Sequence, residues 1–284
     1  MNSIFVLMIA ALVEGDGTRS IVPEELIKAR PKPATTAVPS AAPKYQSATT
    51  PGVAHRPVAS GKQVGVTIWR LRAAASGDSA VRILVQDPEG TVEWVPERVA
   101  STNRLKAGDR VRLSIESPET GYLYVIDRER YSSGLRGDPY LIFPTARTRS
   151  GDNRVSGGRL IDIPAQDDRP SFFRLSQSRP DQTEEELIVL LTREAIPELQ
   201  SAADRVRLTA AQVDEWEKKW GAGKIELFEL SGGAGKSWTQ AEQKAGADAT
   251  RALTQEDPPP QTVYRVTNIR DTEPVLVKVH LRYK

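Results

Sequence analysis

The chain has 284 residues, of which 39% are hydrophobic and 27% charged, a composition typical of soluble globular proteins. Its net charge of +2 is too small for bulk electrostatic attraction to nucleic acid. The chain has no cysteine, which excludes disulfides, thiolate nucleophiles and cysteine metal sites.

The first segment, residues 1–29, contains a continuous apolar run from Ile4 to Val13. A bilayer span needs about 20 apolar residues, so this run predicts no membrane-crossing helix. Its length matches a signal-peptide core, although no basic residue precedes it and no Ala-x-Ala site follows it. We expect an export signal here; the alternative is a short strand or helix that packs on the domain.

The second segment, residues 30–62, is rich in Pro, Ala, Thr and Ser and has almost no apolar volume to bury. Burial could not offset the entropy lost on ordering such a segment, so its composition predicts a disordered, extended linker. His55 lies in this linker and is expected to be solvated. An export signal followed by a linker predicts a periplasmic or cell-surface protein.

The third segment, residues 63–284, is the predicted folded domain, and it begins with apolar and polar residues in alternation. Period-two patterns predict strands over residues 64–71, 81–85, 91–95 and 111–115. Pro118 to Gly121 has the residues of a turn, and the apolar run 122–126 that follows is typical of a strand buried on both faces. We therefore expect the strands on either side of this turn to form a β-hairpin.

Further strands follow the same patterns along the chain. Residues 139–144 are bounded by two prolines, which predicts an edge strand because proline cannot donate to a β-ladder. Residues 186–192 form the most apolar run and are expected to lie centrally in a sheet. The remaining predicted strands are residues 159–164, 171–175, 224–230, 263–266 and 275–281.

Two segments have the signals of helices. Thr209 and Gln212 form a capping box, and Gly221 stands where a helix-ending glycine belongs. Residues 238–253 carry alanine every fourth residue and predict a second helix. The sequence thus predicts a mainly β protein, an antiparallel β-sandwich (Ig-like or related) with two short helices in its C-terminal third.

One glycine-rich segment has part of a nucleotide-binding motif. Residues 232–237 read GGAGKS between a strand and a helix, but Leu230 occupies the position of the first glycine of a P-loop. We interpret the segment as a flexible turn in which Ser237 caps the next helix, and we predict no cofactor.

Catalytic and metal-binding patterns are weak. His55 and His280 are the two histidines, and no G-x-S-x-G nucleophile elbow is present. Asp152 with Asn153, and Asp167 with Asp168, could ligate Ca²⁺, but neither pair has EF-hand spacing. Residues 184–186, three glutamates, are expected to be the solvated start of a strand. We therefore predict neither a metal site nor an enzyme.

Arginine gathers in two segments, residues 128–138 and 147–159, which we interpret as loops. Arginine with tyrosine is typical of recognition surfaces. The alternative is a pair of solvated loops whose arginines pair with nearby acids. Replacement of the first-loop residues is expected to abolish partner capture without lowering the melting temperature. The candidate binding residues are Arg128, Arg130, Tyr131, Arg136, Tyr140, Arg147, Arg149 and Arg154.

Five stretches carry a resemblance to a known family: GDRVRLSIESPETGYLYVIDRERY, PYLIFPT, GDNRVSGGRLIDIPAQ, SRPDQTEEELIVLLT and GGAGKSWTQAEQKAGADATRALTQEDPPPQTVYRV. Through them, residues 64–283 resemble a bacterial family catalogued as domain of unknown function 4384. The resemblance implies a β-rich accessory module, which in some members is attached to caspase-like peptidase or protein-kinase domains. It implies no catalytic residues.

These observations predict a non-catalytic, exported binding or scaffold module. Its expected partner is a protein or a cell-envelope polymer, rather than nucleic acid or the membrane interior. One alternative is a hydrolase of envelope glycans or peptides, which would need a cleft with two carboxylates or a bound metal. The other is a structural assembly subunit, in which the Pro-rich segment or an open edge strand pairs with another chain. The sequence does not specify the oligomeric state.

Overall fold

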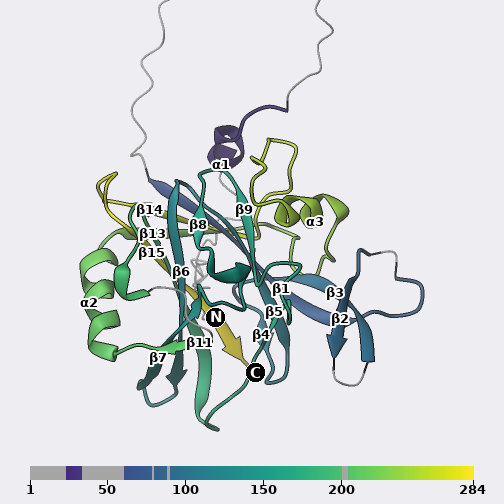
Figure 1. Cartoon of the computed structure of the whole chain (residues 1–284), viewed down its shortest axis with the longest axis horizontal. Helices are drawn as coiled ribbons and strands as arrows, with labels where there is room; N and C mark the ends of the chain where they lie inside the picture. Colours follow the sequence, from purple (N-terminus) through teal and green to yellow (C-terminus); the bar gives the residue numbers. More distant parts are fainter. Residues whose placement is uncertain (1–23, 34–60, 79, 88–89, 200–203) are drawn as a thin grey trace, which may run out of the picture.

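The computed structural model describes residues 24–33, 61–78, 80–87, 90–199 and 204–284 (Figure 1). Most of the expected export signal and most of the expected linker, His55 included, lie outside the described residues. The described chain forms two β-sheets that pack face to face around a shared apolar core. The predicted mainly β sandwich is therefore confirmed.

The first sheet, sheet A, has eight strands in the order β10-β5-β1-β14-β13, with β9 beside β5 and the β2–β3 hairpin beside β1. All its pairings are antiparallel. The first half of β1 pairs with β14 and its second half with β3, so the hairpin projects beyond the sandwich (Figure 1). The strands are β1 (Lys62–Ala73), β2 (Ile83–Asp87), β3 (Gly90–Val99), β5 (Arg110–Glu116), β9 (Leu160–Ile163), β10 (Phe173–Arg174), β13 (Lys224–Glu229) and β14 (Thr262–Thr267).

The second sheet, sheet B, has seven strands in the order β12-β7-β6-β11-β15-β4, with β8 beside β6. The pair β15–β4 is parallel, and the other pairs are antiparallel. As predicted for the most apolar run, β11 lies in the interior of the sheet. The predicted edge strand, β7, is flanked by the two-residue β12. The strands are β4 (Arg104–Leu105), β6 (Gly121–Tyr131), β7 (Arg136–Phe143), β8 (Arg154–Val155), β11 (Gln182–Thr192), β12 (Val206–Arg207) and β15 (Val275–Tyr283).

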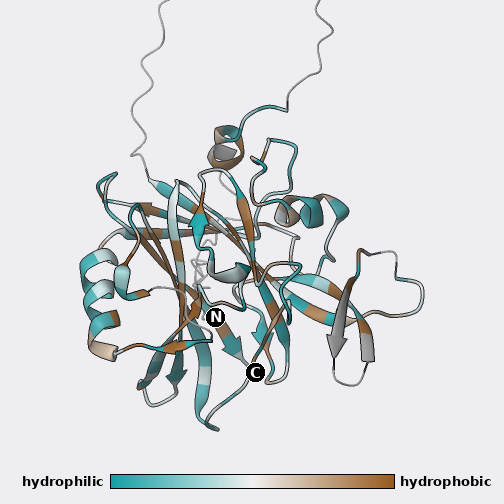
Figure 2. Cartoon of the chain, viewed as in Figure 1, coloured by the Kyte–Doolittle hydropathy of each residue, from teal (hydrophilic) through white to brown (hydrophobic). Residues whose placement is uncertain are grey.

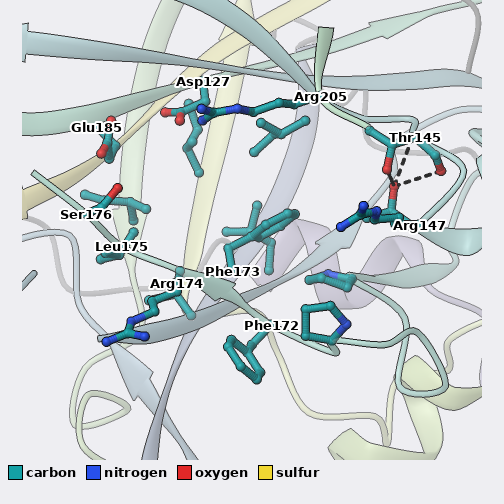
Figure 3. Close-up of a pocket in the computed structure, with 18 of the residues that line it drawn as sticks. Asp127, Thr145, Arg147, Phe172, Phe173, Arg174, Leu175, Ser176, Glu185 and Arg205 are labelled. Atoms are coloured by element: carbon teal, nitrogen blue, oxygen red, sulfur yellow. Dashed lines mark hydrogen bonds between the residues drawn. The ribbon is translucent and has the colours of Figure 1, made fainter. Parts of the chain in front are cut away.

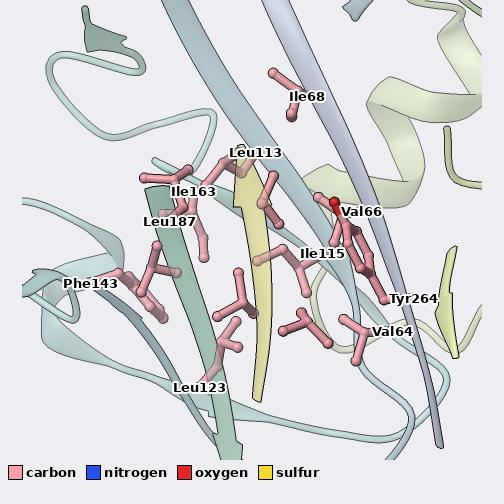
Figure 4. Close-up of a cluster of buried hydrophobic side chains, with 14 of the residues drawn as sticks. Val64, Val66, Ile68, Leu113, Ile115, Leu123, Phe143, Ile163, Leu187 and Tyr264 are labelled. Atoms are coloured by element: carbon pink, nitrogen blue, oxygen red, sulfur yellow. The ribbon is translucent and has the colours of Figure 1, made fainter. Parts of the chain in front are cut away.

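The predicted hairpin of β5 and β6 is wrong, because the two strands belong to different sheets. The turn between them reverses the chain direction, but it connects sheet A to sheet B instead of joining two paired strands. Leu113 and Ile115 of β5 therefore pack in the same buried cluster as Leu123 of β6 (Figure 4). A Cβ on Gly121 would overlap the carbonyl of Thr192, whose carbon would be 3.0 Å away, so the crossover needs glycine where β6 begins beside β11.

The outer face of sheet B is covered by α2 (Ala210–Trp220). Thr209 caps this helix as predicted, since its side chain accepts a hydrogen bond from the Gln212 N–H, and Gly221 ends it. Val213 packs on Tyr124 and Ile126 of β6. The strand β6 is thus buried on both faces, as predicted. In Figure 2 the helix shows a mostly hydrophilic surface.

The third helix, α3 (Gln240–Ala247), is shorter than the predicted 238–253. Its N-cap is Thr239 rather than Ser237. The side chain of Thr239 accepts from the Glu242 N–H, and Glu242 accepts from the Thr239 N–H, which forms a complete capping box. The Ser237 backbone instead forms a bridge to Glu97 of β3, which anchors the glycine-rich turn to sheet A.

One helix, α1 (Glu24–Ala29), was not predicted. Leu26 and Arg30 are buried, although the sequence assigned Arg30 to the linker. Short 3-10 turns occur at η1 (Arg149–Gly151) and η2 (Pro197–Leu199). None of the helices in the described ranges is long and apolar enough to cross a membrane.

Candidate functional site

The first predicted recognition loop is mostly β-strand. Because β6 extends to Tyr131 and β7 begins at Arg136, only residues 132–135 connect the two strands. Arg128 and Arg130 lie at alternate positions after Tyr124 and Ile126, on the face of β6 that α2 covers. These arginines therefore lie near the acidic residues of α2.

The three arginines from this segment bind acids of the same chain. Arg128 Nη1 lies 2.5 Å from Asp214 Oδ1, and Arg136 Nη2 lies 2.5 Å from Glu186 Oε1. Arg130 Nη1 lies 3.0 Å from Glu186 Oε2. We call this network the α2 ion-pair cluster; its members are Arg128, Arg130, Arg136, Glu184, Glu186, Asp214, Glu217 and Lys278.

The electrostatics of the α2 ion-pair cluster favour its charged forms. Burial alone would raise the pKa of Glu217, but hydrogen bonds from Arg136 and Lys278 outweigh burial and lower it. Glu186 is 1% exposed, so the predicted solvated start of β11 is wrong at this residue. The cluster joins α2 to sheet B and engages three of the predicted binding arginines within the chain.

The other predicted residues are distributed around sheet B. Tyr131 donates its hydroxyl hydrogen bond to Glu129, which raises the pKa of Tyr131. The guanidinium of Arg154 lies 5.6 Å from the centre of the Tyr122 ring. The backbone N–H of Arg149 donates to the Asp168 carboxylate at 3.0 Å.

Arg147 lines a pocket, and Tyr140 contacts another residue of its lining, Arg205. Arg205 stacks on the ring of Tyr140, with its Cζ 4.6 Å from the ring centre. Arg205 and Arg147 both line a cavity of about 250 Å³, which we call the inter-sheet pocket (Figure 3). Of the eight predicted residues, Arg147 is the one that lines this pocket. Its apolar lining comes from both sheets and the loop before β10, and it includes Val111, Leu113, Ile142, Phe172, Phe173, Leu175, Leu187 and Leu281.

Two carboxyl groups also line the inter-sheet pocket. In the register of β6 and β11, Asp127 pairs with Leu187 and Glu129 pairs with Glu185, so Asp127 and Glu185 are diagonal neighbours on one face. That face is the inner one, because Leu187 belongs to the core between the sheets. Each carboxyl group is therefore close enough to affect the ionisation of the other.

Two buried carboxyl groups on neighbouring strands would repel each other if both were ionised. Asp127 Oδ1 and Glu185 Oε2 are shut off from solvent, and no N–H or O–H of another described residue reaches them. Glu185 Oε1 accepts instead from the Tyr283 hydroxyl at 2.8 Å and from Gln182 Nε2 at 2.9 Å. These two donors stabilise negative charge on Glu185, so Asp127 is the carboxyl group of the two that more readily holds a proton.

The pKa values of the pair follow from this arrangement. Burial, and then the charge of Glu185, hold the pKa of Asp127 well above its ordinary value. Burial also raises the pKa of Glu185, against the opposing effect of its Tyr283 and Gln182 donors. Burial and the nearby Glu185 raise the pKa of Tyr283, which keeps its hydroxyl a donor.

Sequence reasoning missed both members of this pair. Asp127 falls between the predicted strand 122–126 and the predicted loop 128–138, so it was assigned to neither. Glu185 was expected to be solvated, whereas it is 6% exposed. A signal was present, because Leu187, Val189 and Leu191 alternate inward, and the same period places residue 185 on the inner face.

Across the described ranges no group of three or more His, Cys, Asp or Glu residues could hold a metal ion. His280 Nδ1 lies 3.1 Å from Glu184 Oε1 at the outer face of sheet B. Comparison of the chain with protein-family models, curated proteins and solved structures gives no significant match. The resemblance to domain of unknown function 4384 stays a prediction.

Proposed function

We propose that this chain is a non-catalytic, exported binding module and that the inter-sheet pocket, with its rim, recognises a protein partner. The observation that supports this proposal is a cavity with apolar walls and exposed arginines at its rim. Ligand sites are concave and mostly apolar, with a few polar groups that fix orientation. The partner fragment that fits is an acidic polypeptide segment that carries one large apolar side chain.

The interior of the pocket supports the apolar part of this proposal. Sandwich cores pack at the density of organic crystals, and an unfilled cavity of this kind costs stability. Phe172 and Phe173 bound the cavity at the sheet A edge, and Leu187 bounds it at sheet B. A side chain that enters between these walls would recover the missing contacts.

The rim of the pocket supports the acidic part of the proposal. Arg147, Arg174 and Arg205 are exposed there, against one exposed acid, Asp204. Arg147 Nη2 is 3.6 Å from Asp204 Oδ2, and an ion pair this exposed contributes little stability. Arginines of this kind are available to carboxylates of a partner, and arginine is enriched at interface hot spots.

A fluorescent peptide tests this function directly. The probe is a labelled peptide with one phenylalanine between two pairs of aspartates, and binding is measured by fluorescence anisotropy. The triple variant Arg147→Gln, Arg174→Gln, Arg205→Gln should bind at least tenfold more weakly than the wild type. Binding should also weaken in 0.5 M NaCl, because the rim contacts are screened.

Matched controls separate rim recognition from bulk charge. The triple variant Arg82→Gln, Arg193→Gln, Arg270→Gln removes the same charge from exposed positions outside the pocket, and it should bind like the wild type. A peptide with alanine in place of phenylalanine should bind more weakly. Equal losses in both triple variants, or no difference between the two peptides, would exclude the pocket as the recognition site.

A second candidate function rests on the Asp127–Glu185 pair. Two neighbouring buried carboxyl groups, in which the charge of one raises the pKa of the other, are the arrangement of acid–base dyads in peptide hydrolysis. The closed oxygens Asp127 Oδ1 and Glu185 Oε2 leave little access for an attacking water, which is why we favour binding.

Incubation with unfolded casein separates the two functions. Fragments would be followed by mass spectrometry between pH 4 and 7 for the wild type and for Asp127→Asn. Cleavage by the wild type that disappears in Asp127→Asn would replace the binding proposal with a peptidase. We expect neither protein to cleave casein.

A further inference from the structure

The N-terminal residues that the structure describes, 24–33, behave as a bound peptide. We call this segment the arm. It adds no strand to either sheet, and residues 34–61 separate it from β1. Connections within a compact domain usually take about 4–6 residues. The arm nevertheless lies against the domain, beside the loop that follows α3 (Figure 1).

The arm is held by one deeply buried arginine. The Arg30 side chain is 2% exposed and makes a two-pronged contact with Glu116 of β5. Arg30 Nε lies 2.9 Å from Glu116 Oε1, and Nη2 lies 2.7 Å from Oε2. Nη1 donates to the Asp257 carbonyl at 2.8 Å. We call this the arginine socket; the carbonyls of Thr254 and Pro258 complete it.

The backbone of the arm is recognised as well. Gln255 donates its N–H to the Pro31 carbonyl at 3.0 Å and its Nε2 to the Arg30 carbonyl, also at 3.0 Å. Leu26 of α1 is 8% exposed. A buried anchor side chain, main-chain hydrogen bonds and an apolar contact are the elements by which domains bind short peptides.

The chemistry of the socket selects arginine. The socket offers one carboxylate and several carbonyl oxygens, all acceptors, around a planar group. A guanidinium presents five donors in a fixed fork, whereas a lysine ammonium is a point donor that cannot contact both Glu116 oxygens in this manner.

We propose that the arginine socket is a peptide-binding site and that the arm of a second copy of this chain can occupy it in place of the chain's own arm. The contacts are the same in both cases, as in exchange of an element between identical subunits. The chain's own arm acts at an effective concentration on the order of millimolar. Exchange is therefore detectable when the chain's own arm is disabled.

The test uses the full chain and a labelled peptide with the sequence of residues 24–33, EELIKARPKP, capped at both ends. Arg30→Ala disables the arm and leaves the socket intact. This variant should bind the peptide at least tenfold more tightly than the wild type does. A peptide with alanine or lysine in place of the arginine should bind at least tenfold more weakly, and Glu116→Gln combined with Arg30→Ala should show the same loss.

Complementary full chains extend the test to a second copy. Arg30→Ala has a working socket, and Glu116→Gln has a working arm, so their equimolar mixture should form a 1:1 complex in sedimentation that neither variant forms alone. Arg30→Lys serves as the second arm variant if Arg30→Ala does not fold. Equal binding of the arginine and alanine peptides, or no binding to a folded Arg30→Ala chain, would overturn the proposal. Failure of both arm variants to fold would overturn it too, because the arm would then be an obligatory part of the domain.

Discussion

Asp127 of β6 and Glu185 of β11 are diagonal neighbours across adjacent strands, on the face of sheet B that packs against sheet A. Acidic residues at inward positions would repel each other if both were ionised. The proton on Asp127 removes this repulsion, and Tyr283 and Gln182 compensate the charge of Glu185. The inter-sheet pocket thus contains a buried carboxyl group, Asp127, whose protonation depends on pH.

The pH dependence of stability should reveal this proton. The pKa of Asp127 is raised in the folded chain above its ordinary 3.8. Its stabilising contribution to the free energy of unfolding is therefore fully present below pH 3.8 and is lost as the pH rises through the folded-state pKa. In Asp127→Asn an amide can donate to Glu185 without titrating. The variant should therefore be more stable than the wild type at the alkaline end of the range, as measured by urea unfolding between pH 4 and 9.

Asp204→Asn is the matched control for this experiment. Asp204 lines the same pocket but is exposed, so its replacement should leave the pH dependence unchanged. Parallel curves for Asp127→Asn and the wild type at all pH values would show that the buried pair does not titrate in this way.

Arg136 should contribute to stability rather than to partner capture. Glu186 is 1% exposed, and Arg136 contacts both Glu186 and Glu217. Arg136→Gln leaves Glu186 with Arg130 at 3.0 Å and Lys278 at 3.7 Å, so we expect a loss of about 2 kcal/mol, between the values for exposed and fully buried pairs. Thermal unfolding checks this.

Arg154→Gln provides the comparison for Arg136→Gln. Its guanidinium lies on an exposed surface over Tyr122, and its loss should cost less than about 0.5 kcal/mol. An unchanged melting temperature for Arg136→Gln would restore the expectation, made from sequence, that this arginine is available to a partner.

Gly246 of α3 should resist replacement even by alanine. Alanine in a helix is normally favoured over glycine by about 1 kcal/mol. Here the new Cβ would lie 2.5 Å from Asp162 Cγ, and Ser114 and Gln166 hold that carboxylate in place. We expect Gly246→Ala to destabilise the fold by about 2 kcal/mol, as overpacking does, in denaturant unfolding.

The neighbouring exposed position supplies the control. Ala247→Ser lies in the same turn of α3 but faces solvent, and should change stability by about 0.5 kcal/mol or less. A Gly246→Ala variant that is more stable than the wild type would mean that α3 does not approach β9 this closely.

The two helix caps should differ in their contributions. Thr239 and Glu242 form a reciprocal box, whereas Thr209 makes one bond of 3.3 Å to the Gln212 N–H. Thr239→Ala should cost about 1–2 kcal/mol, and Thr209→Ala about 0.5–1 kcal/mol. Urea unfolding of the two variants gives the comparison. Equal costs would indicate that the second hydrogen bond of the Thr239 hydroxyl, which it donates to the Glu242 carboxylate at 2.7 Å, adds nothing.

The sequence allowed the strands and α2 to be predicted because both depend on local patterns. Alternation located β1, β5 and β15, and Thr209 with Gly221 bounded α2. Sheet membership is not local. The turn at 118–121 has the same chemistry whether it joins paired strands or crosses between sheets, so the hairpin prediction failed.

The candidate site was harder to predict for a related reason. Charged residues at the ends of β6 and β11 were taken for loops or solvated ends, because a single sequence does not show which charges have partners. Arg128 and Arg136 meet Asp214, which lies about 80 positions away, and only the packing of α2 brings them together. The pocket needs inner faces of both sheets, so no single segment of the sequence encodes it.

The depth at which Arg30 is buried affects how shortened versions of this protein should be designed. A truncation that starts at residue 61 would remove the arginine and leave Glu116 uncompensated in an open hollow. An arginine-containing purification tag could then enter that hollow and be mistaken for a natural ligand. Truncated proteins for crystallisation or binding screens should therefore start upstream of Glu24 and carry tags without arginine.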